Sequence, residues 1–292
     1  MRHLYRCPMR WADLDLLGHV NNVTYVDYLQ EARVDMMRAL GQRRESHDDL
    51  EDGVVVVRHE VTYLSPLGLR FRPVSIECWV TEVRAASFTL AYEVFHDDDE
   101  ADGGRRVYLR ATTLLTPYVF TEERPRRLTA DEKAALAPYV EPALAPPTDR
   151  VRTVERADSR HYPLHVRFSD VDLYRHVNNV KYFEYFQEAR IRLLADLTRG
   201  SGVEPASVVV AQTDVDYLRP ILLRPRPYDV WSRVSRLGTR SMTIEAEIRD
   251  AEADAEAGDG ATLARSRVTV VFWDAATQRS TEPPAELRAL LT

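Results

Sequence analysis

This sequence is poor in cysteine and lacks long apolar runs, and both features exclude whole classes of protein. Cys7 and Cys78 are the only cysteines, too few for a disulfide framework or a cysteine zinc site. No apolar run approaches the roughly 20 residues of a membrane-spanning helix, and the first residues contain no apolar core of the kind that a secretory signal needs. We therefore expect a cytoplasmic protein without a membrane partner.

Basic residues are fewer than acidic ones, 39 Lys and Arg against 46 Asp and Glu, which gives the chain a formal net charge of −7. Ten acidic residues are concentrated in two short segments, 97–102 and 250–259, which we interpret as solvated loops between strands. The remainder has a net charge of +3, and nearly all of its cations are arginine. Such a body can accept an anionic ligand such as a nucleotide phosphate, but it lacks the basic pattern that nucleic-acid binding requires.

What the chain does contain is a long internal repeat. Residues 13–33 (DLDLLGHVNNVTYVDYLQEAR) and 170–190 (DVDLYRHVNNVKYFEYFQEAR) are identical at 14 of 21 positions. A hydrophobic core would need matching apolar residues, but it would not need the same Asp, His, Asn, Gln, Glu and Arg. The repeated polar residues therefore indicate a function that both copies perform.

The repeat extends over nearly the whole chain, because the patterns that follow the two motifs also match. We expect two domains, 1–140 and 160–292, each long enough to bury its own core. The segment 141–159 between them is rich in Pro, Ala and charged residues, which is typical of a linker.

Each copy predicts an α+β domain with one long helix and an antiparallel sheet. In the first copy, a strand is expected from Leu4 to Arg10 and a helix from Val23 to about Leu40. Four β-rich segments follow at about 54–64, 73–83, 86–96 and 106–116. The apolar stripe of each helix should face the core. Its members are Tyr25, Tyr28, Leu29, Ala32, Met36, Ala39 and Leu40 in the first copy, and Tyr182, Tyr185, Phe186, Ala189, Leu193 and Leu197 in the second.

The pattern D-x-D-x3-H-V-N-N lies in the loop that enters each long helix, where Asn21 and Asn178 are expected to cap the helix. The amino end of a helix leaves backbone N–H groups without partners and carries a partial positive charge. Such an end attracts anions and can stabilise an oxyanion. A carboxylate and an imidazole beside these donors can direct water at a carbonyl group.

This motif, followed by an aromatic helix that ends in E-A-R, resembles the hotdog-fold acyl thioesterases, in particular the 4-hydroxybenzoyl-CoA thioesterase-like branch and its acyl-ACP relatives. The resemblance covers both copies. It implies two hotdog domains in tandem, each with a sheet wrapped around the long helix, paired edge to edge with the active sites at their interface. It also implies a thioester hydrolase of fatty acid metabolism that converts an acyl-CoA, or alternatively an acyl-ACP, into a carboxylic acid and a free thiol.

The resemblance assigns catalytic roles within the repeat. The catalytic carboxylate of the family and the histidine of its acyl-ACP branch fall on Asp15, Asp172, His19 and His176. Plant acyl-ACP thioesterases have an Asn two residues before this histidine, where the present chain has Leu17 and Tyr174. The hydrogen-bond network that depends on that Asn is therefore absent.

Substrate contacts are expected at the start of each helix. The resemblance places the amide that polarises the thioester carbonyl at about Asn22 and Val23, and at Asn179 and Val180. Tyr25 and Tyr182 are the members of the apolar stripe nearest the helix start, so they are candidates for contact with the substrate.

Other polar residues of the repeat have a structural interpretation. Asp13 and Asp170 are expected to hold turns of the loop, as aspartates in loops commonly do. The residues expected to form structural ion pairs on the helices are Glu31, Arg33, Glu188 and Arg190. No histidine has the paired spacing of a metal ligand, so no metal site and no cofactor are indicated.

Two other functions are compatible with such a fold. A hotdog enoyl-CoA hydratase has its Asp and His five positions apart, whereas His19 follows Asp15 by four positions and Asp13 by six. A non-catalytic acyl-CoA sensor would bind the thioester without releasing the thiol. The acyl group, the relative activity of the two sites and a further homo-oligomeric assembly are left open by the sequence.

Overall fold

The computed structural model describes residues 1–40, 52–97, 104–156, 159–203, 207–253, 260–274 and 276–291. The chain divides into two compact units, Met1–Thr148 and Asp149–Thr292. The division falls inside the segment that we interpret as a linker. The acidic segments 97–102 and 250–259 lie mostly outside the described residues. No described helix has the length and apolarity needed to cross a membrane.

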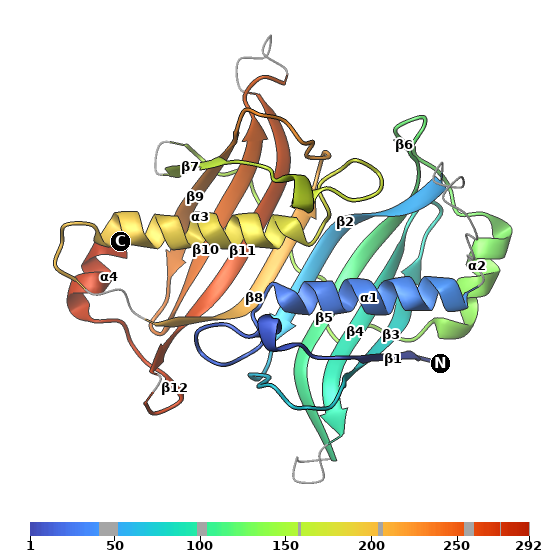
Figure 1. The fold of residues 1–292 in the computed structure, drawn as a ribbon, viewed down its shortest axis with the longest axis horizontal. Coiled ribbons are helices and arrows are strands. Elements are labelled where there is room, and N and C mark those ends of the chain that lie inside the picture. The colour runs from blue at the N-terminus through green and yellow to red at the C-terminus, as the bar shows by residue number, and fades with distance from the viewer. Residues whose placement is uncertain are drawn as a thin grey trace. The chain divides into compact units, whose positions relative to one another are not determined.

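In the N-terminal unit one long helix lies across a face of an antiparallel sheet (Figure 1). The elements are β1 (His3–Cys7), α1 (Thr24–Ala39), β2 (Asp52–Tyr63), β3 (Val74–Val83), β4 (Phe88–Asp97), β5 (Arg105–Val119), β6 (Arg124–Pro125) and α2 (Ala130–Leu136). The strands are hydrogen-bonded in the order β1-β3-β4-β5-β2, and β6 pairs with β5.

The C-terminal unit repeats this layout. Its elements are β7 (Arg160–Leu164), α3 (Lys181–Thr198), β8 (Val208–Tyr217), β9 (Tyr228–Leu237), β10 (Ser241–Asp250), β11 (Ala261–Asp274), β12 (Arg279–Ser280) and α4 (Ala285–Leu291). The strand order is β8-β11-β10-β9-β7, with every pair antiparallel, and β12 pairs with β11. The α+β layout predicted for each copy is therefore confirmed.

The apolar stripes of the long helices form the centre of each core. The buried members are Tyr25, Tyr28, Leu29, Ala32 and Met36 on α1, and Tyr182, Tyr185, Phe186, Ala189 and Leu193 on α3. Ala39 is exposed because it lies in the last turn of α1. The first strand ends at Cys7, earlier than the predicted Arg10, because Pro8 has no N–H to continue the ladder.

One buried residue of α1 is charged. Arg33 is only 9% exposed, and its Nη1 has no hydrogen-bond partner among the described residues. The nearby Tyr92 hydroxyl, on β4, also lacks one, and burial raises the pKa of Tyr92 to about 12 although the Arg33 charge acts to lower it. Glu31 and Glu188 are exposed and form no ion pair within the described ranges. The predicted ion pairs are therefore wrong for Glu31, Arg33 and Glu188, because the carboxylates face solvent while Arg33 faces the sheet.

We expect the substitution Arg33→Met to raise the free energy of unfolding by about 1–2 kcal/mol, because burial of a cation whose Nη1 has no acceptor costs more than burial of a methionine of similar length. Urea denaturation measures the change. Arg190, the equivalent residue of α3, is also buried but does have an interaction partner, so Arg190→Met should lower stability. A loss of stability in both variants would contradict the prediction.

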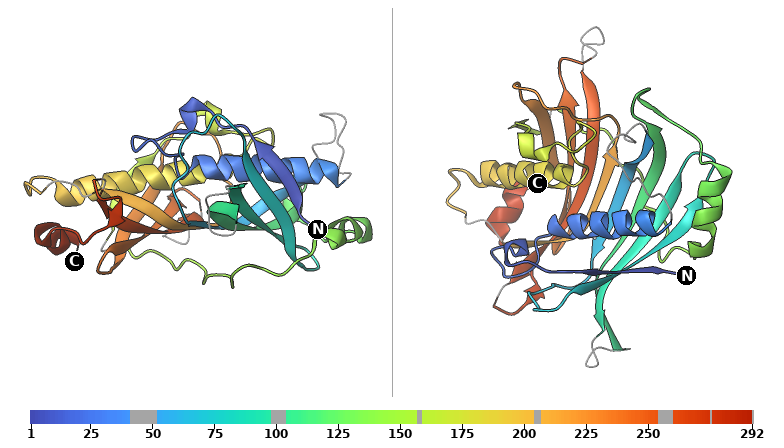
Figure 2. Two further views of the ribbon diagram at one scale, coloured as in Figure 1. Left: turned by 90° about the horizontal axis from the view of Figure 1, so that it is seen from below. Right: turned by 45° about the vertical axis from the view of Figure 1, so that its right-hand side comes forward.

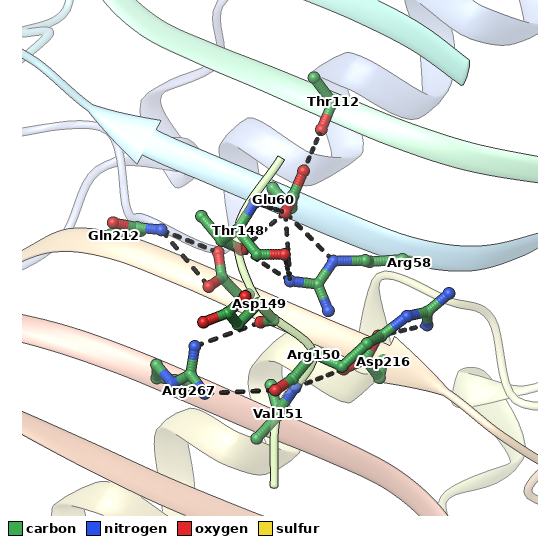
Figure 3. Close-up of polar contacts among 11 residues, drawn as sticks. Arg58, Glu60, Thr112, Thr148, Asp149, Arg150, Val151, Gln212, Asp216 and Arg267 are labelled. Atoms are coloured by element: carbon green, nitrogen blue, oxygen red, sulfur yellow. Dashed lines mark hydrogen bonds and ion pairs between the residues drawn. The ribbon is translucent and has the colours of Figure 1, made fainter. Parts of the chain in front are cut away.

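The segment that follows α2 runs along the face of the sheet opposite α1 (Figure 2) and ends, in the N-terminal unit, on Glu60 of β2. The backbone N–H and the hydroxyl of Thr148 donate to Glu60 Oε1 over 2.7 and 2.6 Å, and Thr112 donates to Oε2 over 2.8 Å (Figure 3). Burial acts to raise the pKa of Glu60, but the hydrogen bonds from Thr148 and Thr112 outweigh it and hold the pKa below its usual range.

The C-terminal unit holds its own end of this segment in a similar way. Asp216 of β8 is buried and accepts from Arg150 Nη1 at 2.5 Å and from the Val151 N–H at 2.9 Å (Figure 3). Arg267 of β11 donates to the carbonyl oxygens of Asp149 and Arg150. The predicted linker therefore contains residues that satisfy the half-buried carboxylate of Glu60 on one side of the division and the buried carboxylate of Asp216 on the other.

Candidate active site

The repeated motif folds into a tight loop that delivers the chain into the long helix. In the N-terminal unit the Asp15 N–H donates to the His19 carbonyl at 2.8 Å, and Gly18 N–H closes a turn onto the Asp15 carbonyl at 3.0 Å. The Asn21 N–H then returns to the Asp13 carbonyl at 2.8 Å. The C-terminal unit makes the same three bonds, through Asp172, Arg175 and Asn178, at 2.9, 3.0 and 2.8 Å.

The first aspartate of each motif holds this loop on the helix. Asp13 is 2% exposed, and its Oδ2 accepts from the Tyr28 hydroxyl at 2.5 Å and from the Arg10 N–H at 2.7 Å. Asp170 accepts likewise from the Tyr185 hydroxyl at 2.7 Å. With their oxygens engaged in buried hydrogen bonds, these carboxylates have the structural role expected of them.

The second aspartate is held differently. Asp15 is half-buried, and its Oδ1 accepts from the backbone N–H groups of Leu17 at 2.8 Å and His19 at 3.3 Å. Its Oδ2 accepts no hydrogen bond from the described residues. One oxygen thus fixes the carboxylate in the loop while the other stays available for chemistry.

Asp172 occupies the equivalent position, with its Oδ1 accepting from the Tyr174 N–H at 2.9 Å. Burial raises its pKa above the ordinary value of 3.8, and this effect exceeds the opposing influence of the Tyr174 and His176 N–H groups and of the His176 charge. A carboxylate with a raised pKa is a stronger base than an ordinary aspartate.

The histidines bind the loop through their backbones. The ring of His19 has no hydrogen-bond partner within the described ranges, so the imidazole does not orient Asp15 in this structure. The His176 charge does act on Asp172. Residues 19 and 176 also pair with the loops that follow β2 and β8, at Gly68 and Leu222.

At the helix start, two of the expected oxyanion donors are already engaged. The N–H of Val23 donates to Asn21 Oδ1 at 2.9 Å, and that of Val180 donates to Asn178 Oδ1 at 3.0 Å. The helices begin one residue after Val23 and Val180, which are the N-cap residues and carry no side-chain cap hydrogen bond, so the predicted caps Asn21 and Asn178 are wrong. Each asparagine instead closes a turn just before its helix, and this turn removes Val23 and Val180 as free donors. The N–H of Asn22 makes no hydrogen bond in the part of the chain that the structure describes, and Asn179 lies at the equivalent place.

Two tyrosines that we did not select from the sequence hold this turn. The Tyr63 hydroxyl donates to the Asn22 carbonyl at 2.8 Å, and the Tyr217 hydroxyl donates to the Asn179 carbonyl at 2.9 Å. The only signal in the sequence is that Tyr63 and Tyr217 match in the repeat. Because each fixes the peptide next to a candidate donor, we interpret them as positioning residues.

Tyr25 and Tyr182, by contrast, are buried in the core beside these tyrosines. The Tyr182 hydroxyl accepts from the Ile221 N–H at 3.1 Å, and Tyr25 has the same relation to the Leu67 N–H. Burial raises the pKa of both phenols well above their usual value. Their hydroxyl oxygens accept from a neighbouring loop, and contact of Tyr25 and Tyr182 with a substrate stays a prediction.

A metal centre and an apolar pocket are the other places where a functional site could lie. No group of three or more His, Cys, Asp or Glu side chains there is placed to hold a metal ion. A small apolar pocket in the C-terminal unit lies toward the far end of α3, beside Leu194 and Thr198, and contains no titratable side chain. The motif loops therefore stay the candidate site.

Solved structures share this fold over nearly the whole chain. The 12:0-ACP thioesterase from Umbellularia californica is similar with a TM-score of 0.72 and 15% identity, covering 92% of this chain and 93% of that one. An acyl-ACP thioesterase from Bacteroides thetaiotaomicron has a TM-score of 0.67 and 13% identity, with coverages of 92% and 97%. Identity this low establishes the fold alone, and it confirms the tandem hotdog architecture. The edge-to-edge pairing stays a prediction.

Sequence comparison supplies the family. The Bacillus subtilis (strain 168) protein named "Uncharacterized protein YsmA" is 37% identical over 82 residues, which are 27% of this chain and about half, 53%, of that protein. The sequence pattern of the Thioesterase-like superfamily matches residues 9–141 and 166–291, so each match includes one motif loop. The predicted resemblance is confirmed, and the predicted class of enzyme, a thioester hydrolase, agrees with it. The chain therefore belongs to the Thioesterase-like superfamily and carries two copies of its domain.

Proposed function

We propose that the protein hydrolyses acyl-CoA thioesters to a carboxylic acid and free CoA, with Asp15 and Asp172 as the carboxylates of two half-sites. The observation that carries the proposal is the state of the Asp15 carboxylate. Its Oδ1 is fixed by two loop N–H groups, while its Oδ2 has no partner among the described residues. Burial adds basicity to the equivalent Asp172.

In the proposed reaction the thioester carbonyl lies at the start of the long helix. The Asn22 N–H, or Asn179 in the second half-site, donates to the carbonyl oxygen, and the positive end of the helix stabilises the negative charge that develops there. The carboxylate takes a proton from water, which attacks the carbonyl carbon, or it attacks directly to form an anhydride that water then opens. The C–S bond breaks, and the thiolate leaves and is protonated. His19 and His176 are the proposed helpers for that proton.

Hydrolysis of a panel of short, long and aryl acyl-CoA thioesters tests the proposal. A thiol-reactive dye should report release of free CoA from at least one member, in proportion to protein concentration. Hydration of an enoyl-CoA without thiol release would favour the hydratase. Tight binding of acyl-CoA with no thiol released would favour a sensor, and either result would overturn the thioesterase.

The pH dependence of the second half-site gives a separate prediction. In an Asp15→Asn variant only Asp172 can serve as base, and it must be ionised, so kcat/KM should fall as pH drops through the raised pKa of Asp172. The midpoint of this acid limb should lie above the ordinary 3.8. A pH profile of the variant on the best acyl-CoA measures it, and an acid limb at or below 3.8 would contradict the assignment.

The same pKa has a consequence of opposite sign for stability. The folded state holds the Asp172 proton more tightly than the unfolded state. The contribution of this proton to the free energy of unfolding is therefore complete below about pH 3.8, and it is lost as pH rises through the pKa of Asp172 in the folded state. Asp172→Asn should remove this pH-dependent term, which a comparison of urea denaturation of both proteins across the acid range would reveal.

A further inference from the structure

One position of the motif loop differs between the two units in a way that the fold does not require. Gly18 and Arg175 are equivalent, and both have left-handed backbone conformations, with φ of +75° and +64°. Glycine adopts this conformation freely because it has no Cβ, whereas an arginine adopts it at a cost in free energy. The C-terminal unit thus retains a strained residue in a loop that the N-terminal unit builds without strain, which points to a use for the side chain.

No structural role accounts for that side chain. Arg175 is exposed, and its guanidinium forms no hydrogen bond or ion pair within the described ranges. Only its backbone N–H is engaged, with the Asp172 carbonyl at 3.0 Å. Arg175 is not a counter-ion for Asp172 either, because the pKa of Asp172 responds to burial, to two backbone N–H groups and to the His176 charge, but not to Arg175. The cation is available to a ligand.

The surface beside Arg175 is apolar. Leu173 is 67% exposed and Leu222 is 47% exposed, and the pairing of His176 with Leu222 holds their two loops side by side. A ligand for this surface would combine an uncharged chain with an anionic group. A guanidinium is suited to phosphate, which it binds through two parallel hydrogen bonds.

We propose that Arg175 binds a phosphate group of the thiol carrier in the second half-site, with the uncharged pantetheine arm crossing Leu173 and Leu222. The inference rests on the proposed function, since it takes the carrier to be a pantetheine thiol. The first half-site has Gly18 at this position and binds the carrier without the cation. The two half-sites therefore differ in carrier affinity although they share the same carboxylate loop.

Calorimetric titration with free CoA and with pantetheine, which has no phosphate, tests the proposal without requiring turnover. In Arg175→Gly the tighter class of CoA sites should weaken about tenfold, the size expected for loss of one charge-assisted contact. Pantetheine affinity should not change. Relief of the strained backbone should keep the variant at least as stable as the parent in urea, so weaker binding cannot be attributed to unfolding.

Gly18→Arg is the matched variant, because a Cβ at Gly18 meets nothing within 4 Å, and the arginine would have the same left-handed backbone strain that Arg175 has. It should tighten CoA binding at the first half-site and increase the salt dependence of that binding. Phosphopantetheine distinguishes the phosphates. If phosphopantetheine and CoA both bind Arg175→Gly more weakly than the parent, Arg175 contacts the phosphate of the pantetheine arm. If only CoA binds the variant more weakly, Arg175 contacts a phosphate of the nucleotide. Both results support the proposal.

Equal CoA affinity in the parent and in Arg175→Gly would overturn the proposal. So would an equal loss with pantetheine, which would mean that the arginine acts without a phosphate. If CoA affinity stays unchanged while binding of an acyl carrier protein weakens, Arg175 faces a protein surface and the assignment is wrong. Failure of the proposed function has a different signature, in which CoA binding depends on Arg175 but no acyl-CoA releases its thiol.

Discussion

The double variant Asp15→Asn, Asp172→Asn is expected to lose nearly all thioester hydrolysis while it stays folded. A positioned general base contributes about 10²–10⁴ in rate, so kcat should fall by a factor in this range. Asparagine matches aspartate in shape, and its amide oxygen can still accept from the N–H groups that Asp15 Oδ1 binds. The loop should therefore survive the loss of charge.

Thiol release on the best acyl-CoA measures this loss, and urea denaturation checks that the variant is folded. The single variants serve as controls, because each leaves one half-site intact and should retain the activity of that half-site alone. A double variant that keeps most of the parental rate would show that neither carboxylate takes part in the reaction.

Asp13→Ala is expected to act on stability and not directly on chemistry. The alanine leaves the buried Tyr28 hydroxyl and the Arg10 N–H without the acceptor that Asp13 Oδ2 provides. Removing one partner of such a buried, charge-assisted arrangement costs on the order of 3 kcal/mol. The midpoint of urea denaturation should fall accordingly, and Asp170→Ala should behave in the same way because Asp170 accepts from Tyr185.

Asp15→Ala is the matched control, since Asp15 is only two residues away but half-buried and bonded to N–H groups at the surface of the loop. It should cost much less stability than Asp13→Ala. The replacement Tyr28→Phe in both backgrounds gives a double-mutant cycle that isolates the Tyr28–Asp13 hydrogen bond. Equal stability of Asp13→Ala and Asp15→Ala would contradict the assignment of a structural role to Asp13 and a catalytic role to Asp15.

The parts of the fold that depend on local periodicity could be predicted from the sequence. The long helices were expected at the right places because their apolar residues recur every three to four positions, and the strands were found within a few residues of the predicted segments. The predicted N-cap at Asn21 was wrong by two residues, because its side chain closes a turn onto Val23 before the helix begins. The repeat added to these signals, since each element was present twice.

The parts that depend on distant contacts could not be predicted. Nothing near Asp13 in the sequence indicates that Tyr28 is its partner, because helix α1 must first pack on the sheet. Arg33 lies one turn after Leu29, on the flank of the apolar stripe, where its charge suggested a structural ion pair, and only the structure shows it buried. The engagement of Val23 is a local effect, because the Asn21 side chain accepts from the residue two positions later and removes that N–H from further use.

The contacts of Thr148 bear on any attempt to express the two halves as separate proteins. Composition suggests ending the first half at residue 140. Such a truncation would remove Thr148, whose N–H and hydroxyl donate hydrogen bonds to the Glu60 carboxylate. A second half that began at 160 would likewise strip Asp216 of Arg150 and Val151. Division at the single peptide bond between Thr148 and Asp149 keeps Thr148 with Glu60 in one half and Arg150 and Val151 with Asp216 in the other.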